Sequence, residues 1–227
     1  MKRFLVVCAM KEELDGLLSS YEKYEEKDNY YLVKDAEKEV YVILGGIGKA
    51  SMAFTIGKFL ALHKVDMIIN TGVAGVLFKA LKPLDIFVAT KSAYYDVDVL
   101  AFGYKRGQMC SQPLYYDCLK DGVDFLMSKN DPSIKRGLII SGDTFITKDN
   151  TPKDLEKDFD HPVAIDMESA SVGQCANIEK LPYMIIRAIS DDTENEGNKD
   201  VYDKLLKEAS NKAGKLTAET ISYLSSK

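Results

Sequence analysis

The residues best suited to do chemistry are carboxylates that follow apolar segments. Glu168 comes shortly after the apolar run 163–165, and Asp191 ends the mostly apolar run 185–190. Each run is predicted to be a buried strand, which places the acid at the rim of a sheet, where α/β folds bind ligands. Glu13 repeats the pattern after segment 4–10. Three strand ends with acidic tips predict a site that works by carboxylate chemistry.

Carboxylates around an apolar pocket suit the cleavage of a glycosidic bond. One acid protonates the leaving group while another activates water, and the anionic oxygens stabilise a transition state that resembles an oxocarbenium ion. Residue types alone therefore indicate a glycosidic or related hydrolase and go no further.

Each of these residues also has a purely structural interpretation. Glu13 opens the first predicted helix, where the helix dipole favours an acidic residue. Glu168 or Asp191 could form a structural ion pair with Arg187, because a buried carboxylate is costly without hydrogen-bond partners or a task. Phe145, on the polar segment after 141–143, either belongs to a small apolar cluster or stacks on an aromatic ligand.

Glycines follow several predicted strands and favour close approach of the backbone to a ligand. They occur in segments 44–49, 70–75 and 141–143. The first segment is not a phosphate-binding loop, because Lys49 is followed by alanine. It is not a dinucleotide-binding fingerprint either, because the third glycine is missing. Taken singly, each segment could be a tight turn between a strand and a helix; together, at successive strand ends, they favour a ligand site.

The elements that must position these residues alternate between strand and helix over the whole length. We therefore expect an α/β fold, a single-domain α/β/α sandwich over residues 1–227 around a mixed, mostly parallel, twisted central sheet. Segment 22–41 is charged and aromatic and predicts a hairpin at the sheet edge. Segment 115–128 predicts a helix, and the acidic segment 191–200 predicts a mobile loop. The apolar runs predict strands at 4–8, 30–33, 40–44, 67–69, 86–89, 138–140, 163–165 and 183–189.

Composition narrows the class of protein further. The 227 residues carry a net charge of -5 and are 46% hydrophobic, and Lys and Arg are scattered rather than clustered. This argues against nucleic acid or an anionic membrane as the main partner. No signal-type segment or membrane-length apolar run is present. The four cysteines lack CxxC spacing and predict reduced thiols in a cytoplasmic protein. A catalytic cysteine is disfavoured, since only His63 and His161 could assist it.

Eight segments, in order along the chain, resemble the nucleoside phosphorylase/nucleosidase superfamily, and most closely the bacterial 5′-methylthioadenosine/S-adenosylhomocysteine nucleosidases. Singly each match is weak, but eight in the family's order are specific and cover nearly the whole chain. They are AMKEE at 9–13, GIGKA at 46–50, INTGVAG at 69–75, YDVD at 95–98, AFGY at 101–104, SGDTFI at 141–146, DME at 166–168 and RAISD at 187–191.

The resemblance implies a role for each candidate residue. Glu13 is expected to activate the attacking water, Asp191 to assist protonation of the departing adenine, and Glu168 to bind the ribose hydroxyls. The resemblance places the remaining candidates around the substrate: Met167 against the sugar, Phe145 and Ile146 at the adenine, Ser190 orienting the acid, Arg187 supporting the water and carboxylates, Val73, Ala74 and Gly75 along the substrate, and Ile47, Val99 and Phe102 around the 5′-thio group.

The resemblance further implies adenine nucleosides as substrates, no metal or organic cofactor, and a homodimer in which the partner chain completes the 5′ pocket. Three positions depart from the family's pattern. Val73 replaces a small hydroxylic residue, Asp166 replaces a glutamate, and Val76 stands where a second glycine is frequent. The alternatives are a purine nucleoside phosphorylase, a 5′-deoxyadenosine or futalosine-type hydrolase, and a non-catalytic nucleoside-binding protein. The acid-rich start disfavours bound phosphate, and the retained Glu13 and Asp191 disfavour the non-catalytic alternative.

Overall fold

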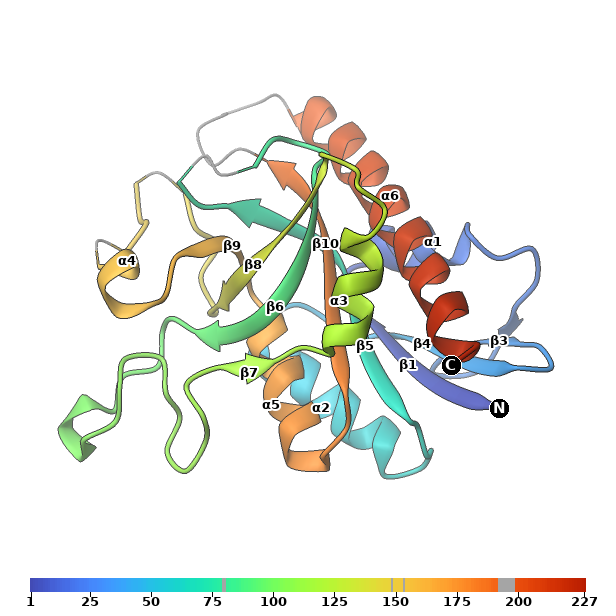
Figure 1. Ribbon diagram of the computed structural model, residues 1–227, viewed down its shortest axis with the longest axis horizontal. Helices are drawn as coiled ribbons and strands as arrows, with labels where there is room; N and C mark the ends of the chain where they lie inside the picture. The colour runs from blue at the N-terminus through green and yellow to red at the C-terminus, as the bar shows by residue number, and fades with distance from the viewer. Residues whose placement is uncertain (79–80, 148, 153, 192–198) are drawn as a thin grey trace.

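The computed structural model describes residues 1–78, 81–147, 149–152, 154–191 and 199–227, with the side chains of 191 and 199–202 left out. Strands and helices alternate along much of the chain, as the sequence predicts (Figure 1). In chain order the elements are β1 (Lys2–Cys8), α1 (Lys11–Leu18), β2 (Glu25–Glu26), β3 (Tyr31–Lys34), β4 (Lys38–Leu44), α2 (Lys49–Leu60), β5 (Met67–Val76), β6 (Ile86–Tyr94), the 3₁₀ turn η1 (Leu100–Phe102), β7 (Tyr116–Asp117), α3 (Lys120–Met127), β8 (Ile134–Ser141), α4 (Leu155–Asp158), β9 (Pro162–Asp166), α5 (Ser169–Glu179), β10 (Tyr183–Asp191) and α6 (Lys199–Ser225). The alternation is broken where β2, β3 and β4, and also β5 and β6, follow one another directly.

The strands form one mixed sheet that closes on itself. The order β10-β6-β8-β9-β5 becomes a ring because β10 also pairs with β5. Among the described pairings, the parallel ones are β1–β4, β1–β5, β5–β10, β6–β8 and β8–β9. The antiparallel ones are β6–β10, β2–β3, β3–β4, β5–β9 and β6–β7. The prediction of a mixed α/β sheet is confirmed. The ring differs from the expected sandwich around a mostly parallel sheet, because β10 pairs with both β5 and β6 and so closes the sheet.

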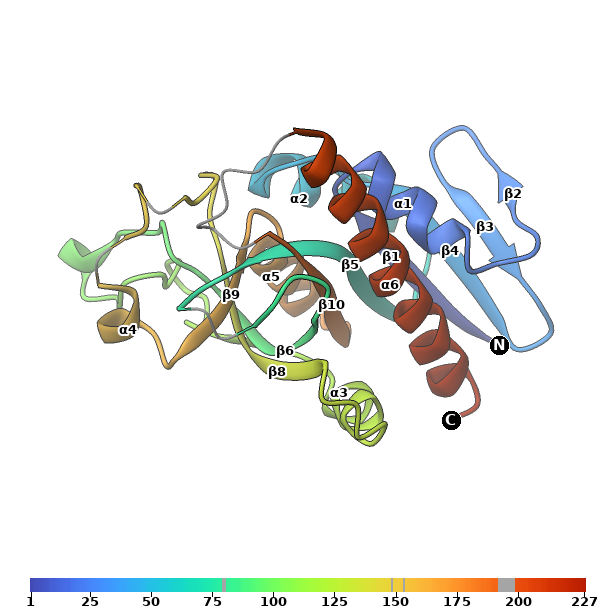
Figure 2. The ribbon, with the colours of Figure 1, turned by 90° about the horizontal axis from the view of Figure 1, so that it is seen from above.

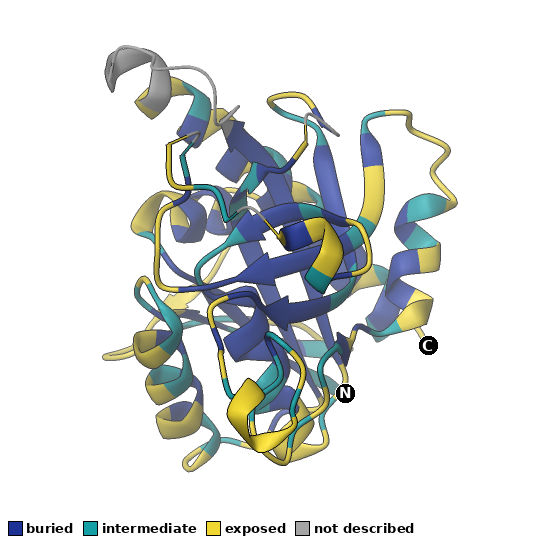
Figure 3. Ribbon diagram, turned by 90° about the vertical axis from the view of Figure 1, so that its left-hand side faces the viewer, coloured by how far each residue is buried: buried dark blue, intermediate teal, exposed yellow. Residues whose placement is uncertain are grey.

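Helices cover the outside of this sheet, so that its strands are buried on both faces. Helix α6 packs against α1, β5 and β10, while α5 packs against α2, β6 and β8. Residues 4–8 of β1 are all buried, as the unbroken run of apolar residues predicts. Figure 3 shows the strands as the buried centre and the helices with exposed outer surfaces.

The segment 22–41 forms the expected hairpin at the edge of the sheet, with β3 antiparallel to β4 and β2 outermost. Figure 2 shows this hairpin at one end of the molecule and α4 at the other. The helix predicted over 115–128 begins only at Lys120, because Tyr116 and Asp117 instead pair with β6. Most of the predicted loop 191–200 lies outside the described residues. No helix among the described residues is long and apolar enough to cross a bilayer.

Candidate active site

A cavity of about 220 Å³ opens where β1, β5, β9 and β10 end. Its walls come from six parts of the chain that are distant in sequence: the start of α1, the turn after β4, the end of β5, the segment after β8, the β9–α5 turn and the end of β10. The lining residues are Ala9, Met10, Glu13, Ile47, Val73, Ala74, Thr144, Phe145, Ile146, Ile165, Asp166, Met167, Glu168 and Ser190. The cavity is largely apolar, with carboxylates as its ionisable groups.

Glu13 sits in the first turn of α1 and is only 2% exposed. Its Oε2 accepts hydrogen bonds from the backbone N–H groups of Ala9 (2.7 Å) and Met10 (3.0 Å), and its Oε1 accepts one from Val73 of β5 (2.9 Å). Burial raises the pKa of Glu13, whereas Arg187 and the three N–H groups lower it, and burial dominates. The carboxyl is therefore fixed in place and held as a base stronger than an ordinary glutamate.

Glu168 stands at the N-terminus of α5, opposite Glu13, and is 6% exposed. Its Oε1 accepts a hydrogen bond from the backbone N–H of Gly48 at 2.8 Å, which ties it to the turn after β4. Burial and the neighbouring Asp166 raise the pKa of Glu168 to about 7, against the opposing effects of Arg187 and the Gly48 N–H.

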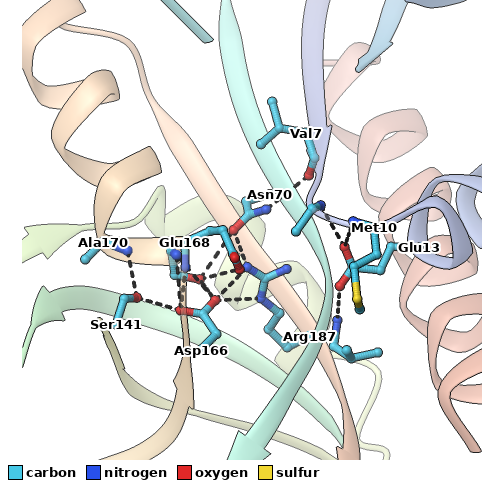
Figure 4. A network of polar contacts seen from close by, with 12 residues as sticks. Val7, Met10, Glu13, Asn70, Ser141, Asp166, Glu168, Ala170 and Arg187 are labelled. Atoms are coloured by element: carbon cyan, nitrogen blue, oxygen red, sulfur yellow. Dashed lines mark hydrogen bonds and ion pairs between the residues drawn. The ribbon is translucent and has the colours of Figure 1, made fainter. Parts of the chain in front are cut away.

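Arg187 lies behind the cavity, fully buried, on β10 beside Gly72 of β5. Its ion pair among the described residues is with Asp166, whose Oδ2 accepts from Nη2 at 2.6 Å and from Nε at 3.1 Å. Nη2 also donates to Asn70, and Figure 4 shows the guanidinium between Glu13 and the Asp166–Glu168 turn. Burial alone would lower the pKa of Arg187, but the three surrounding carboxylates outweigh it and keep the pKa above its usual value.

Asp166 is the centre of this polar network. Its Oδ1 accepts from the Ser141 hydroxyl at 2.5 Å and from the backbone N–H of Ser169 at 3.1 Å, in addition to the bonds that Oδ2 makes with Arg187. The carboxylate thus joins the ends of β8 and β9, the N-terminus of α5 and β10. Among the described side chains, Asp166 rather than Glu168 makes the ion pair with Arg187, and the side chain of Asp191 lies outside the described residues.

The structure brings most of the predicted site residues together. Nine of them line the cavity: Glu13, Glu168, Met167, Phe145, Ile146, Ser190, Val73, Ala74 and Ile47. Phe145 and Ile47 are respectively 60% and 55% exposed, so both lie at its open side. Phe145 is therefore not part of a closed apolar cluster.

Five predicted residues are placed otherwise. Gly75 and Arg187 lie next to the cavity but not in its lining, Val99 is half-buried against the core, and Phe102 on η1 is 77% exposed. Asp191 ends β10, with its backbone paired to Gly75, and its side chain lies outside the described residues.

Several residues of the site were not predicted from the sequence. The backbone N–H groups of Ala9, Met10, Val73 and Gly48 carry no side-chain signal, although they hold the two glutamates. Asn70, buried in β5, bonds Arg187 and the Val7 carbonyl, and an asparagine inside an apolar strand is the signal that could have revealed it. Among the described residues, no group of three His, Cys, Asp or Glu side chains is arranged to hold a metal ion.

The carboxyl groups of Glu13 and Glu168 lie in different environments, which suit them to different roles. Glu13 receives three N–H donors and faces the guanidinium, so it suits proton abstraction from a water at the cavity floor. Glu168 accepts one N–H through Oε1 and lines the cavity, which suits hydroxyl groups of a ligand. Apolar residues and the Phe145 ring offer a surface for a flat heterocycle.

Comparisons with known proteins identify the family of the chain. The family model for the Phosphorylase superfamily matches residues 3–222. The 5′-methylthioadenosine/S-adenosylhomocysteine nucleosidase of Buchnera aphidicola is 35% identical over 197 residues, 84% of this chain and 85% of the relative. That of Staphylococcus carnosus is 30% identical over 226 residues, 96% of this chain and 99% of the relative.

A solved structure from S. pneumoniae gives the same result at the level of the fold. It is a 5′-methylthioadenosine/S-adenosylhomocysteine nucleosidase with the transition-state inhibitor MT-ImmA, and it is similar to this chain with a TM-score of 0.89, 33% identity, and coverage of 98% of this chain and 99% of that one. Because the family model, the relatives and the solved structure all match nearly the whole chain, the chain belongs to the 5′-methylthioadenosine/S-adenosylhomocysteine nucleosidase family of the Phosphorylase superfamily.

Proposed function

We propose that this protein hydrolyses the N-glycosidic bond of 5′-methylthioadenosine and S-adenosylhomocysteine, with 5′-deoxyadenosine as a further candidate substrate. The observation that carries the proposal is the pair of buried glutamates, Glu13 and Glu168, on opposite sides of an apolar cavity. Family membership over almost the full length supports the same reaction. The products are free adenine and the thio-substituted ribose.

In the proposed reaction a water oxygen attacks C1′ of the ribose while the bond from C1′ to the adenine nitrogen breaks. Glu13 takes the proton from the water. The adenine leaves with the bonding electron pair and is neutralised by a proton that Asp191 helps to deliver, with Ser190 orienting it. Developing positive charge on the sugar is stabilised by the carboxylates.

The binding roles follow the cavity from one end to the other. Glu168 accepts hydrogen bonds from the ribose hydroxyls, and Met167 packs against the sugar. Phe145 stacks on the adenine, and the Ile146 backbone bonds its edge. The Arg187 Nη1 has no hydrogen-bond partner among the described residues, so it can donate a hydrogen bond to the attacking water. The guanidinium charge also stabilises the carboxylates. The other proposed contacts are made by Val73, Ala74 and Gly75 along the substrate and by Ile47, Val99 and Phe102 around the 5′-thio group.

Water is preferred over phosphate as the nucleophile because of the charge of the cavity. Its lining includes Glu13, Asp166 and Glu168, and no Lys, Arg or His is among the described lining residues. A phosphate dianion would meet carboxylates there without a lining cation, which is unfavourable in a poorly solvated cavity.

The test is to incubate the purified protein with each nucleoside, with and without phosphate, and to measure adenine and the sugar product. Free sugar and a rate independent of phosphate are expected. A phosphate requirement with a sugar 1-phosphate as product would overturn the proposal. Glu13→Gln should lower kcat by about 100-fold or more, whereas the neighbouring exposed Glu12→Gln should leave it unchanged.

We further propose that the protein works as a homodimer of one-domain chains in the cytoplasm. Leu44, Phe54 and Leu62 are 49%, 72% and 75% exposed and share one surface hollow near Ile47 of the active site. Such an apolar surface beside an open cavity favours cover by a second copy. The four cysteines are all unpaired, which supports a reducing compartment.

A further inference from the structure

A charged cluster lies at the rim of the cavity, next to its lining but not part of it. Lys49 begins α2, Asp96 follows β6 and Asp143 follows β8. The Lys49 Nζ lies 2.5 Å from an Asp96 oxygen and 3.7 Å from an Asp143 oxygen. The Asp143 backbone N–H donates to Asp96 at 3.0 Å. Three segments that follow different strands are thus joined by one lysine and two carboxylates.

We propose that Asp143, supported by Asp96 and Lys49, is a positioning residue that holds the turn 46–49 so that the Gly48 N–H stays directed at Glu168. The proposal deepens the function proposed above and rests on it. None of the three residues need touch the substrate, because they act through the turn.

Asp143 acts on the turn as a helix cap supplied by another loop. Gly48 is the N-cap of α2 and has no side chain to accept a hydrogen bond from the first turn. Asp143 Oδ1 fills this role by accepting the Lys49 N–H at 2.8 Å. Its negative charge also lies at the positive end of the α2 dipole. The orientation of the peptide groups around Gly48 therefore depends on Asp143.

The geometry at Gly48 leaves little freedom for the turn. Its φ of +91° lies in the region that favours glycine, and a Cβ there would meet Asp143 Oδ1 at 3.0 Å. In this conformation the Gly48 N–H donates to Glu168 Oε1 at 2.8 Å. Successive N–H groups, of Gly48 and Lys49, are thus directed at two different carboxylates, and moving Asp143 would move the donor that orients Glu168.

The same contact links the two ends of the cavity. Asp143 directly precedes Thr144, Phe145 and Ile146, which line the cavity. The bond between Asp143 and the α2 N-terminus therefore fixes this segment as well as the turn that holds Glu168. A change at Asp143 is expected to weaken contacts at the sugar and at the heterocycle together.

A contribution to stability alone does not account for the cluster. The side chains of Lys49 and Asp96 are each 25% exposed and that of Asp143 is 48% exposed, and ion pairs so accessible to solvent contribute little to stability. The Lys91–Asp160 pair offers a matched control, with a distance of 2.9 Å and a lysine exposed to 24%, and neither residue lines the cavity.

The experiment compares the kinetics of Asp143→Ala, Asp143→Asn, Lys49→Met and the control Asp160→Ala in the full chain, with 5′-methylthioadenosine as the probe. Asp143→Ala should raise KM by about tenfold, the usual effect of losing a hydrogen bond to a charged group, with a much smaller change in kcat. Asp143→Asn retains an oxygen that can accept the Lys49 N–H and should recover most of the loss. Lys49→Met should shift KM in the same direction, and Asp160→Ala should match the wild type.

A pH profile separates positioning from a general structural effect. Since the Gly48 N–H lowers the pKa of Glu168, its displacement in Asp143→Ala should move the acid limb of kcat/KM to higher pH. The limb that belongs to Glu168 is the one lost in Glu168→Gln. If Asp143→Ala folds, an unchanged KM and an unchanged pH profile of kcat/KM in this variant would overturn the inference. If Asp143→Ala does not fold, the same result in Lys49→Met would overturn it. Failure of the wild type to release adenine would instead overturn the proposed function.

Discussion

At the scale of single residues, Arg187 is the one cation among several carboxylates in the described part of the site. Arg187 is fully buried, pairs with Asp166 at 2.6 Å, and faces Glu13 and Glu168. Without it, three acids would share a poorly solvated region with no compensating positive charge. The main effect of a buried guanidinium in this position is to compensate the negative charge of the carboxylates.

Replacing Arg187 by methionine should therefore destabilise the fold strongly. We expect a loss of about 3–5 kcal/mol in the free energy of unfolding, because the Asp166 carboxylate would remain buried without its partner. Urea denaturation followed by circular dichroism measures this loss. The control is Arg3→Met, whose ion pair with Asp66 is between side chains 34% and 44% exposed, and which should change stability little. Equal effects at the two sites would contradict the prediction.

The raised pKa of Glu168 makes stability depend on pH. Because the folded-state pKa is about 7 and the ordinary value is 4.5, the folded protein binds this proton more tightly than the unfolded chain does. The contribution is fully present below pH 4.5 and is lost as pH rises through 7. A tenfold change in proton affinity corresponds to about 1.4 kcal/mol, so the free energy of unfolding should change by a few kcal/mol.

Glu168→Gln should remove this dependence by replacing the ionisable group with a neutral one of similar shape. Measured without ligand at pH 5 and pH 8, the wild type should lose more stability than the variant as the pH increases. Parallel loss in both proteins would show that Glu168 titrates normally.

The sequence identified the acids at this scale but not what holds them. Glu13 and Glu168 are recognisable because they follow predicted strands. Asp166 stands out in the sequence only as a departure from the family's pattern, and its bonds to Ser141 and Arg187 depend on three strand ends meeting in space. The N–H groups of Gly48 and Val73 bind carboxylates through backbone atoms that every non-proline residue carries, so no residue type reveals them.

At the scale of elements, strand β5 can approach Glu13 and Arg187 closely because it carries a glycine, Gly72, at that point. Gly72 lies beside Arg187 in the register of β5 and β10. A Cβ at this position would overlap Glu13 Oε1 and would lie 2.7 Å from Arg187 Nη1. The strand therefore passes directly beside Glu13, which lines the cavity, and Arg187, which lies behind it.

Gly72→Ala should displace Glu13 or Arg187, lower adenine release sharply and destabilise the protein by about 1–3 kcal/mol through overpacking. Gly57→Ala is the matched control, since a Cβ there meets nothing within 4 Å in the exposed face of α2. This variant should gain about 0.5–1 kcal/mol from helix propensity with full activity. Thermal unfolding and an adenine assay measure both effects, and an active Gly72→Ala would show that the site accommodates the methyl group.

Most strands were predictable because they are short apolar runs bounded by polar residues, as in β1, β4 and β8. The start of α3 was not, because residues 116–117 pair with β6, and that pairing depends on a strand more than twenty residues earlier in the chain. Closure of the ring was missed for the same reason. Pairing of β10 with both β5 and β6 is a matter of strand order, which local patterns do not encode.

At the scale of the whole molecule, large apolar side chains are exposed at the open side of the cavity and in a separate surface hollow. Ile47 is 55% exposed and Phe102 is 77% exposed, and the hollow formed by Leu44, Phe54 and Leu62 lies nearby. Phe102 lies outside the cavity lining, so its proposed contact with the 5′-thio group depends on the proposed dimer. One chain's sequence contains no information on where a second copy sits.

Leu62→Asp should convert the proposed dimer to a monomer, because a carboxylate would be buried in an apolar interface. Sedimentation equilibrium or light scattering should give half the wild-type mass. The control is Tyr24→Asp, because the side chain of Tyr24 is 48% exposed but does not line the hollow. A wild type that is already monomeric at assay concentrations would contradict the dimer, and not the hydrolysis.

The closed ring of strands also bears on how this protein behaves at high concentration. Ring closure leaves β2 and β7 as the ends of the described sheet, and each is only two residues long. The outermost strand β2 consists of two exposed glutamates, Glu25 and Glu26. Short, like-charged edges resist pairing with other chains. The ends of the described sheet therefore offer little template for edge-to-edge aggregation, although the interior is rich in the apolar strand segments that would promote it if exposed.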